Sequence, residues 1–292
     1  MNTETCRLCG GSTEALGAVF GTFSQRHYML RRCTRCRYAF IADPWTEFER
    51  IYDERYYAGH GADPLVDYNF ELAEPAATIR RYEWSGITRL VGSLLGGLDG
   101  VRWLDFGCGN GGLVRHLLAT TNVVASGFEQ GSIAAKARQL GIPIASDDSD
   151  LNRQPGSLDV VSAIEVIEHT VDPLAELRKI RALLRPGGLL VLTTGNAAPF
   201  ADRLASWSYV RPEIHVSFFE PGTLALALGQ AGFRPASIGS ARGFDEILKF
   251  KVLKNLGVKR RNRFTDLIPA RPVGLAADRR TRLSRMPLGW AV

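Results

Sequence analysis

The stretch Val101-Arg102-Trp103-Leu104-Asp105-Phe106-Gly107-Cys108-Gly109-Asn110-Gly111-Gly112 places a short apolar run directly before a glycine-rich bend. Residues 101–106 have the composition of a strand buried on both faces, and a helix is predicted over 111–119. Glycines at such a bend let the backbone pass close to a ligand without a Cβ in the way. The stretch therefore predicts the first strand, loop and helix of an α/β sheet, with a ligand at the loop.

Strands and helices alternate along the chain after this loop. Strands are predicted over 123–128, 142–145, 158–164, 189–193 and 234–238, and helices over 132–140, 173–184 and 221–231. The apolar runs are short and nearly continuous, as strands covered on both faces require. Alternation of this kind predicts a doubly wound, mostly parallel sheet, which we assign to a domain over 98–245.

The segments on either side of this domain differ from it in composition. Residues 44–97 are rich in aromatic side chains, and we expect them to form a helical connector or substrate lid with a helix over 73–95. Residues 246–292 are expected to form a basic C-terminal tail. From Lys249 onward the chain carries twelve Lys and Arg against two acids, or +10, so the remainder of the +6 chain is −4. Residues 248–252 fit either a strand or a helix.

Composition and charge narrow the functional classes. The acidic body argues against a nucleic-acid-binding face, and the tail is the one candidate for contact with something anionic. The N-terminus lacks the pattern of a signal peptide, and no apolar run reaches the roughly 18 residues of a membrane span. We therefore expect a cytoplasmic protein, in which paired cysteines bind metal more often than they form disulfides.

Two cysteine pairs open the chain. Cys6-x-x-Cys9 and Cys33-x-x-Cys36 are separated by 23 residues, and four such thiolates can close a tetrahedral shell around Zn²⁺. The alternatives are two redox pairs or unligated thiols. A short piece with few apolar residues could hardly fold without a staple, so we predict a zinc-ribbon module over 1–43 with a structural metal.

The glycine loop leaves two classes of nucleotide open. Gly107, Gly109 and Gly112 satisfy the dinucleotide fingerprint G-x-G-x-x-G, and the next strand ends in Glu129, which could accept hydrogen bonds from ribose hydroxyls. Asp105, however, lies two residues before the first glycine. A carboxylate there suits an amine-bearing or cationic ligand better than a pyrophosphate.

Several motifs, in order and at fitting spacings, resemble class I S-adenosylmethionine-dependent methyltransferases. Residues 104–111 resemble their first motif, 158–169 their fourth strand and its exit, and 184–188 the turn before the fifth strand. Residues 215–221 and 231–233 resemble a small-molecule subgroup. The cysteine leader resembles that of bacterial methyltransferases acting on sugars, although Arg37 stands where that subgroup has glycine. The resemblance implies a seven-stranded Rossmann-like sheet and S-adenosylmethionine as cofactor.

The resemblance also implies roles for individual residues. Gly107, Gly109 and Gly111 would line the methionine portion of the cofactor, Asp105 would hold the loop and the amino group, and Glu129 would bind the ribose. The remaining assignments are Asp150 with the Leu151 backbone at the adenine, where Asp147 and Asp148 compete, and Ile164 and Glu165 beside the sulfonium. The alternative interpretation of Glu165 and Glu168 is that of ordinary carboxylates at a helix start, which we prefer for Glu168.

Methyl transfer to a hydroxyl needs a base at the carboxyl ends of the strands. His169 and His215 are the candidates, because an imidazole titrates near neutral pH, and Glu213 could orient or replace His215. For each histidine a structural hydrogen bond is the alternative.

The sequence thus predicts O-methylation of a small molecule or of a sugar or glycolipid hydroxyl. The alternatives are C-methylation of a sugar nucleotide, whose enzymes carry a longer C-terminal domain than the roughly 50 residues after Ile238, and a non-catalytic zinc-ribbon adaptor. Nucleic acid methylation is disfavoured by the acidic body and the absent N-P-P-Y type signature. The tail either contacts anionic lipid or is a solvated end.

Overall fold

The main sheet carries the glycine loop. The computed structural model describes residues 4–60, 65–151, 155–236, 241–270 and 289–291. The strands of the sheet are β4 (Arg102–Phe106), β5 (Val124–Phe128), β6 (Ile144–Ala145), β7 (Leu158–Ile164), β8 (Leu184–Gly195) and β10 (Gly289–Ala291). Their order is β10-β8-β7-β4-β5-β6, and all neighbours are parallel except β10. The predicted doubly wound parallel sheet is therefore confirmed.

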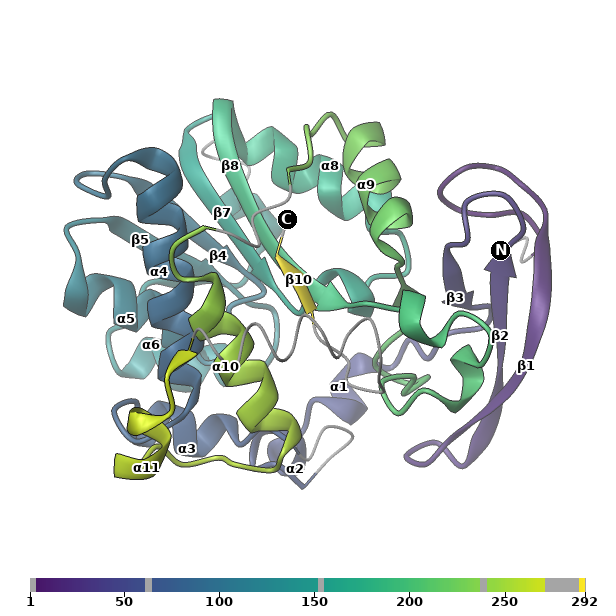
Figure 1. Cartoon of the computed structure of the whole chain (residues 1–292), viewed down its shortest axis with the longest axis horizontal. Helices are drawn as coiled ribbons and strands as arrows, with labels where there is room; N and C mark the ends of the chain where they lie inside the picture. The colour runs from purple at the N-terminus through teal and green to yellow at the C-terminus, as the bar shows by residue number, and fades with distance from the viewer. Residues whose placement is uncertain (1–3, 61–64, 152–154, 237–240, 271–288, 292) are drawn as a thin grey trace.

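Helices cover both faces of this sheet (Figure 1). They are α4 (Arg80–Leu95), α5 (Gly112–Thr120), α6 (Ile133–Gln139) and α10 (Phe244–Asn255) on one face, and α8 (Pro173–Leu183) and α9 (Pro221–Gln230) on the other. Successive residues of a strand point to opposite faces of the sheet. Trp103 therefore packs in the core under α4, α5, α6 and α10, and Leu104 packs in the core under α8 and α9. Burial on both faces is why the strands have no polar alternation.

The edge of the sheet differs from the expectation of seven strands. Within the described residues this sheet has six strands, and the last of them along the chain, β10, pairs antiparallel with β8. The strand predicted over 234–238 is not formed at residues 234–236, and residues 237–238 lie outside the described residues.

The cysteine module forms a second, antiparallel sheet. Its strands are β1 (Thr13–Gly21), β2 (Arg26–Cys33), β3 (Ala39–Ile41) and β9 (Ser217–Phe218), in that order. Because β9 comes from the chain after β8, the module shares a sheet with the main domain. Tyr38 and Ser217 add a buried hydrogen bond of 2.6 Å between their hydroxyls. The predicted module at 1–43 is therefore joined to the domain by sheet and by core.

Short helices connect the two sheets. They are α1 (Phe48–Ile51), α2 (Glu54–Tyr57) and α3 (Tyr68–Ala73), followed by α4. The single helix predicted over 73–95 is interrupted, since α3 ends at Ala73 and α4 begins at Arg80. Pro75 lies in the gap, where its missing N–H and its ring oppose a continuous helix.

The segment expected to be a basic tail is partly folded onto the domain. Residues 248–252, which fitted a strand or a helix, belong to α10, and the expected boundary at 246 falls inside that helix. Lys249 and Lys251 of α10 are buried. A short helix, α11 (Arg263–Leu267), follows. Among the described residues, no helix has the length and apolarity needed to cross a membrane.

Candidate active site

A cavity of about 1570 Å³ opens where β4, β5 and β7 end. Eight of the predicted site residues line it: Asp105, Gly107, Gly109, Glu129, Ile164, Glu165, His169 and His215. The cavity is also lined by tyrosines of the connector, whose role as a substrate lid stays a prediction: Tyr52, Tyr56, Tyr57 and Tyr68. One space therefore holds the glycine loop, the candidate bases and an aromatic wall.

Glu129 braces the glycine loop. Its carboxylate accepts hydrogen bonds from the backbone N–H groups of Gly109, at 2.9 Å, and Gly131, at 2.7 Å. Gly107 has a φ of +71°, and a Cβ there would lie 2.6 Å from Cγ2 of Val166. The loop can approach the exit of β7 in this way only with glycine at 107.

Gly111 has a different environment from the other two glycines of the motif. It caps the start of α5 with a φ of +71°, and a Cβ there would lie 2.8 Å from Cδ1 of Ile144. It is not among the residues that line the cavity. The positive φ and the close packing against Ile144 explain why residue 111 is a glycine. Its contact with a ligand remains a prediction.

Asp105 is buried at the end of β4. The Ser162 hydroxyl donates a 2.6 Å hydrogen bond to it, and Trp103 Nε1 donates to that hydroxyl at 2.9 Å. Burial raises the pKa of Asp105 to about 7, although the Ser162 hydrogen bond opposes the shift. A cationic group entering the cavity would favour the ionised form.

The acidic run expected at the adenine lies beside α7 (Asp148–Leu151). Leu151 is buried in the core, Asp148 pairs with Lys179 at 2.5 Å, and neither Asp150 nor Leu151 lines the cavity. Residues 152–154, which follow directly, lie outside the described residues. The adenine assignment stays a prediction.

The two carboxyl groups at the exit of β7, Glu165 and Glu168, have pKa values shifted in opposite directions. Glu165 accepts from the Thr193 hydroxyl at 3.0 Å and meets Lys251 Nζ at 2.9 Å. Burial opposes its ionisation, but the charge of Lys251 prevails and lowers the pKa of Glu165 to about 2. Burial, followed by the charge of Glu165, raises the pKa of Glu168 to about 8. The Tyr209 hydroxyl lies 2.5 Å from Glu168 and 3.4 Å from Glu165.

This geometry corrects the preferred interpretation of Glu168 as an ordinary helix-start carboxylate. Its side chain is completely buried, and it accepts from the hydroxyls of Thr194 and Tyr209. Only a short 3₁₀ turn, η1 (Ile167–His169), follows β7, so no long helix starts there. Glu168 is held by buried hydrogen bonds.

The two candidate bases face each other, with ring centroids 4.9 Å apart. His215 Nδ1 lies 2.6 Å from the carbonyl oxygen of Tyr209, which can only accept, so Nδ1 carries the proton. Nε2 of the neutral ring is then the basic nitrogen. His169 Nδ1 lies 3.2 Å from the Tyr52 hydroxyl.

Glu213 has a partner other than His215. Its carboxylate accepts three hydrogen bonds from the turn between β1 and β2, from the backbone N–H groups of Phe23 and Ser24 and from the Ser24 hydroxyl. It does not line the cavity. The structure therefore places Glu213 at the junction with the cysteine module, and its predicted role as a base or orienting group finds no geometric support.

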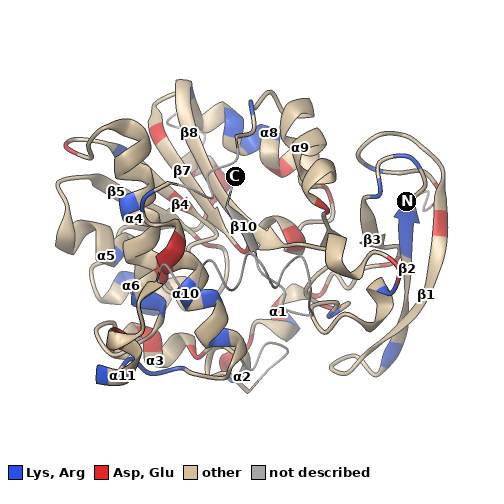
Figure 2. Cartoon of the chain, viewed as in Figure 1, with Lys and Arg blue, Asp and Glu red and all other residues tan. Residues whose placement is uncertain are grey.

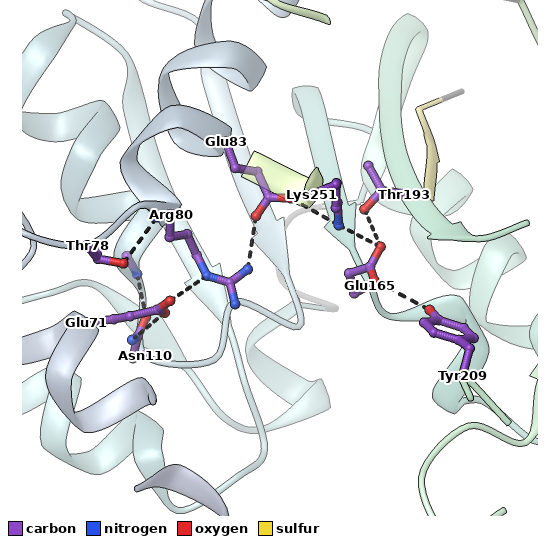
Figure 3. Close-up of polar contacts among 10 residues, drawn as sticks. Glu71, Thr78, Arg80, Glu83, Asn110, Glu165, Thr193, Tyr209 and Lys251 are labelled. Carbon is purple, nitrogen blue, oxygen red and sulfur yellow. Dashed lines mark hydrogen bonds and ion pairs between the residues drawn. The ribbon is translucent and has the colours of Figure 1, made fainter. Parts of the chain in front are cut away.

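A buried network of charges was missed by the sequence analysis. Its members are joined by ion pairs in the order Glu71, Arg80, Glu83, Lys251 and Glu165 (Figure 3), and all of them except Lys251 line the cavity. No local pattern distinguishes these residues from surface charges. The only signal was that residues 248–252 also fit a helix, which would have placed Lys251 on a helix after the sheet.

The four cysteines of the N-terminal module lie together. The Sγ atoms of Cys6 and Cys36 are 3.6 Å apart, those of Cys9 and Cys33 are 3.4 Å apart, and all four lie within 4.8 Å of one another. Tetrahedral bonds of about 2.3 Å to Zn²⁺ separate sulfur atoms by about 3.8 Å, so the arrangement fits. All four thiols are free of disulfides.

Comparisons with known proteins point in one direction. Residues 63–238 match the family model described as a methyltransferase domain. The ubiquinone biosynthesis O-methyltransferase of Xanthomonas campestris pv. campestris (strain B100) is 37% identical over 117 residues, which cover 37% of this chain and 48% of that protein. The protein of the same name from Bordetella pertussis is 29% identical over 163 residues, covering 49% of this chain and 66% of that protein. The chain thus spans about half to two thirds of the length of these relatives.

A solved structure shows the same fold. Phosphoethanolamine N-methyltransferase 2 from Haemonchus contortus, in complex with phosphomonomethylethanolamine and S-adenosylhomocysteine, has a TM-score of 0.50 at 14% identity. The alignment covers 84% of this chain and 59% of that one. The family match extends over more than half of the chain, and the doubly wound sheet with a cavity at its glycine loop agrees with it. The chain therefore belongs to the methyltransferase domain family.

Proposed function

We propose that the protein transfers a methyl group from S-adenosylmethionine to a hydroxyl of a small molecule or of a sugar or glycolipid. The observation that carries the proposal is that Glu129, braced on the N–H of Gly109, shares one cavity with the imidazole of His215. The first group suits a ribose, and the second suits an acceptor proton. The volume and the tyrosine wall leave room for an acceptor beside the cofactor.

The cofactor would occupy the glycine-loop side of the cavity. Glu129 would accept from the ribose hydroxyls, and the backbone of Gly107 and Gly109, which lines the cavity, would meet the methionine portion. Asp105 lies where a cationic amino group can ionise it, and Arg80, a buried cation on the wall, suits a carboxylate. When bound, the cofactor supplies an electrophilic methyl group on a sulfonium.

His215 would act as the general base. The Tyr209 carbonyl accepts the proton of Nδ1, so Nε2 is the nitrogen that would take the proton of the acceptor hydroxyl as the oxygen–methyl bond forms and the methyl–sulfur bond breaks. His169, 4.9 Å away between ring centroids, would orient the acceptor or replace His215 in this step. The tyrosine wall would exclude water and align the acceptor with the methyl group.

We also propose that the four cysteines hold a structural Zn²⁺. A shell of four thiolates has no open position for substrate, so the metal would act on folding alone. The N–H groups of Arg35 and Cys36 point at Cys33 Sγ at 3.4 Å each, a contact that stabilises a thiolate. Reduced thiols of this kind are consistent with a cytoplasmic location.

The segment after α10 is a candidate for contact with anionic lipid, where a lipid-linked acceptor would be found. Leu256, Phe264 and Leu267 expose 64%, 80% and 78% of their surface. The exposed basic residues of the same segment are Lys259, Arg260 and Arg263, and Arg260 lies over the Phe70 ring of α3. Figure 2 shows basic residues on and beside α11. Co-sedimentation with vesicles containing phosphatidylserine should fall for Phe264→Ser and be unchanged for Phe20→Ser, an equally aromatic exposed position on β1. Equal loss in both variants would argue against this contact.

Calorimetric titration tests the main proposal. S-adenosylhomocysteine should bind the wild-type protein, NAD should not, and Glu129→Ala should abolish binding, whereas Glu74→Ala, an exposed position, should leave it unchanged. Binding of NAD alone would overturn the proposal. With the cofactor established, His215→Asn should lower kcat about 100-fold or more for any acceptor found by screening, with little effect on cofactor affinity.

A further inference from the structure

An alternating chain of charges crosses the wall of the cavity. Arg80 lies 2.8 Å from Glu71 and 2.9 Å from Glu83, and Lys251 lies 3.1 Å from Glu83 and 2.9 Å from Glu165. Figure 3 shows Glu71 of α3 beside Arg80 of α4, and Lys251 linking Glu83 of α4 to Glu165 at the exit of β7. The five charges sum to −1, because Arg80 and Lys251 together offset two of the three carboxylates.

Lys251 is brought to this position by α10. The side chain is 4% exposed, and its helix packs on α4 at a contact between two glycines. A Cβ on Gly86 would lie 2.6 Å from the carbonyl oxygen of Gly243, and one on Gly243 would lie 2.1 Å from that of Gly86. The two backbones therefore meet without side chains between them, which lets the ammonium group reach across α4 to β7.

The partner of Lys251 is held in an unusual conformation. Glu165 has a φ of +57°, a region that residues other than glycine rarely adopt. Its backbone N–H donates to the Thr193 carbonyl at 2.9 Å, and its carboxylate accepts from the hydroxyl of the same threonine. Strain of this kind persists where the surroundings determine the conformation, and it is concentrated at functional sites.

We propose that Lys251 is a positioning residue that keeps the Glu165 carboxylate ionised and turned into the cavity, where it faces the positive charge of the cofactor. The inference rests on the proposed function for the nature of that cofactor. It assigns a role in the reaction site to α10, which lies outside the stretch matched by the methyltransferase family model. The chemical cause is a cation that offsets the cost of burying a carboxylate.

Among the charged and titratable groups around Glu165, Lys251 has the largest effect in lowering the pKa of its carboxyl. Those that face it are Lys251 and Lys254 of α10, Glu83 of α4 behind Lys251, Glu168 of η1 and Tyr209 of the loop between β8 and β9. Without Lys251, burial and the neighbouring acids would all raise the pKa of Glu165. Lys254 and the hydrogen bond from the Thr193 hydroxyl would remain to lower it.

The first experiment needs no ligand. The side-chain ¹³C carboxyl resonance of Glu165, assigned with Glu165→Gln, is followed against pH in the wild type, Lys251→Met and Lys249→Met. Lys249 is an equally buried lysine on the same helix, but its ammonium group donates to the Ile268 carbonyl and lies over the Tyr82 ring. We expect Glu165 to stay ionised down to about pH 4 in the wild type and in Lys249→Met, and to titrate at least 2 pH units higher in Lys251→Met.

The second experiment measures S-adenosylmethionine affinity from pH 5 to pH 8.5 on the same proteins. Lys251→Met should lose affinity by up to about tenfold per pH unit as Glu165 takes up a proton. Lys249→Met should follow the wild type, and Lys251→Arg should restore the wild-type profile. A merely structural role for Lys251 would lower affinity equally at every pH.

The outcomes separate this inference from the proposed function. A Glu165 titration that is unmoved by Lys251→Met overturns the inference, whatever the wild type binds. A wild type that binds no S-adenosylmethionine contradicts the proposed function, and the Glu165 titration still decides whether Lys251 positions that carboxylate. Lys251→Gln, which keeps a hydrogen-bond donor, takes the place of Lys251→Met if the latter does not fold.

Discussion

Arg37 follows the last cysteine of the module in a left-handed backbone conformation, with a φ of +64°. Glycine would adopt this conformation without strain, which explains why the resembling subgroup has glycine there. The arginine obtains a compensating contact, since its Nε lies 2.8 and 2.9 Å from the two carboxylate oxygens of Glu220, the residue before α9. A single side chain thus ties the cysteine module to the main domain at the cost of local strain.

Substitution at this position separates the two effects. Arg37→Ala and Arg37→Gly both remove the ion pair with Glu220, but only alanine keeps the strained backbone. We expect the glycine variant to be more stable than the alanine variant by about 1 kcal/mol. Urea unfolding of both variants measures the difference, and equal stabilities would mean that the left-handed conformation is not retained.

Glu168 predicts a pH dependence of stability. The pKa of its buried carboxyl is raised to about 8 from the usual 4.5, chiefly by burial. Between these two values the folded protein holds a proton that the unfolded chain has lost, so the stability is fully present below pH 4.5 and declines as pH rises through 8. Glu168→Gln cannot titrate.

The stability of the wild type relative to Glu168→Gln should therefore fall between pH 5 and pH 8.5. Unfolding in urea at four or five pH values gives this difference directly. A difference that does not change with pH would show that Glu168 is already ionised in the folded protein.

At the scale of the elements, the helices α4 and α10 pack closely at Gly86 and Gly243. A methyl group added at Gly86 would meet the carbonyl oxygen of Gly243 at 2.6 Å and Ile247 at 2.9 Å. At Gly92, two turns further along the same helix, the nearest atom would be a Leu98 side-chain carbon at 3.4 Å. Both glycines lie in α4, but only Gly86 is in contact with α10.

Alanine at these two positions should have opposite effects. Gly86→Ala should destabilise the protein by about 1–3 kcal/mol because α10 must move away from α4. Gly92→Ala should be neutral or stabilising by up to about 1 kcal/mol, because alanine favours a helix. Chemical denaturation tests both variants, and a tolerated Gly86→Ala would contradict the close contact.

At the scale of the whole molecule, the cysteine module and the main domain share a sheet and a core, so we expect them to unfold together. The strand β9 pairs with β3, and Cys6, Leu8, Cys33 and Phe40 lie in the same core as residues of α8 and α9. The Thr223 hydroxyl donates to the Cys36 carbonyl at 2.7 Å. Loss of the metal should therefore weaken more than the first 43 residues.

Metal analysis and calorimetry test this unity. We expect one Zn²⁺ per chain in the wild type, and removal of the metal should lower the melting temperature of a single transition that includes the main domain. Cys108→Ala, at the cysteine outside the module, should leave the zinc content unchanged. Two separate transitions, with the second unaffected by chelation, would be the contrary result.

The sequence by itself determined the parallel sheet, the glycine loop and the clustering of the four cysteines. Each of these is written in local form: a buried strand is a continuous apolar run, a tight bend needs glycine, and a closed metal shell needs two cysteine pairs. The placement of Glu129 beside the loop also followed, because parallel strands end at one edge of a sheet.

Only the tertiary structure decided where the isolated charges act. Lys251 resembled a solvated tail residue, Glu168 a helix-start carboxylate and Glu213 a partner of His215, and all three have other surroundings in the folded chain. The energy of a charge depends on its burial and on groups far away in sequence, which no local pattern records. The cysteine site could be predicted because its four ligands form two local sequence pairs. The charge network from α4 to β7 could not, because it depends on the packing of α10 against α4.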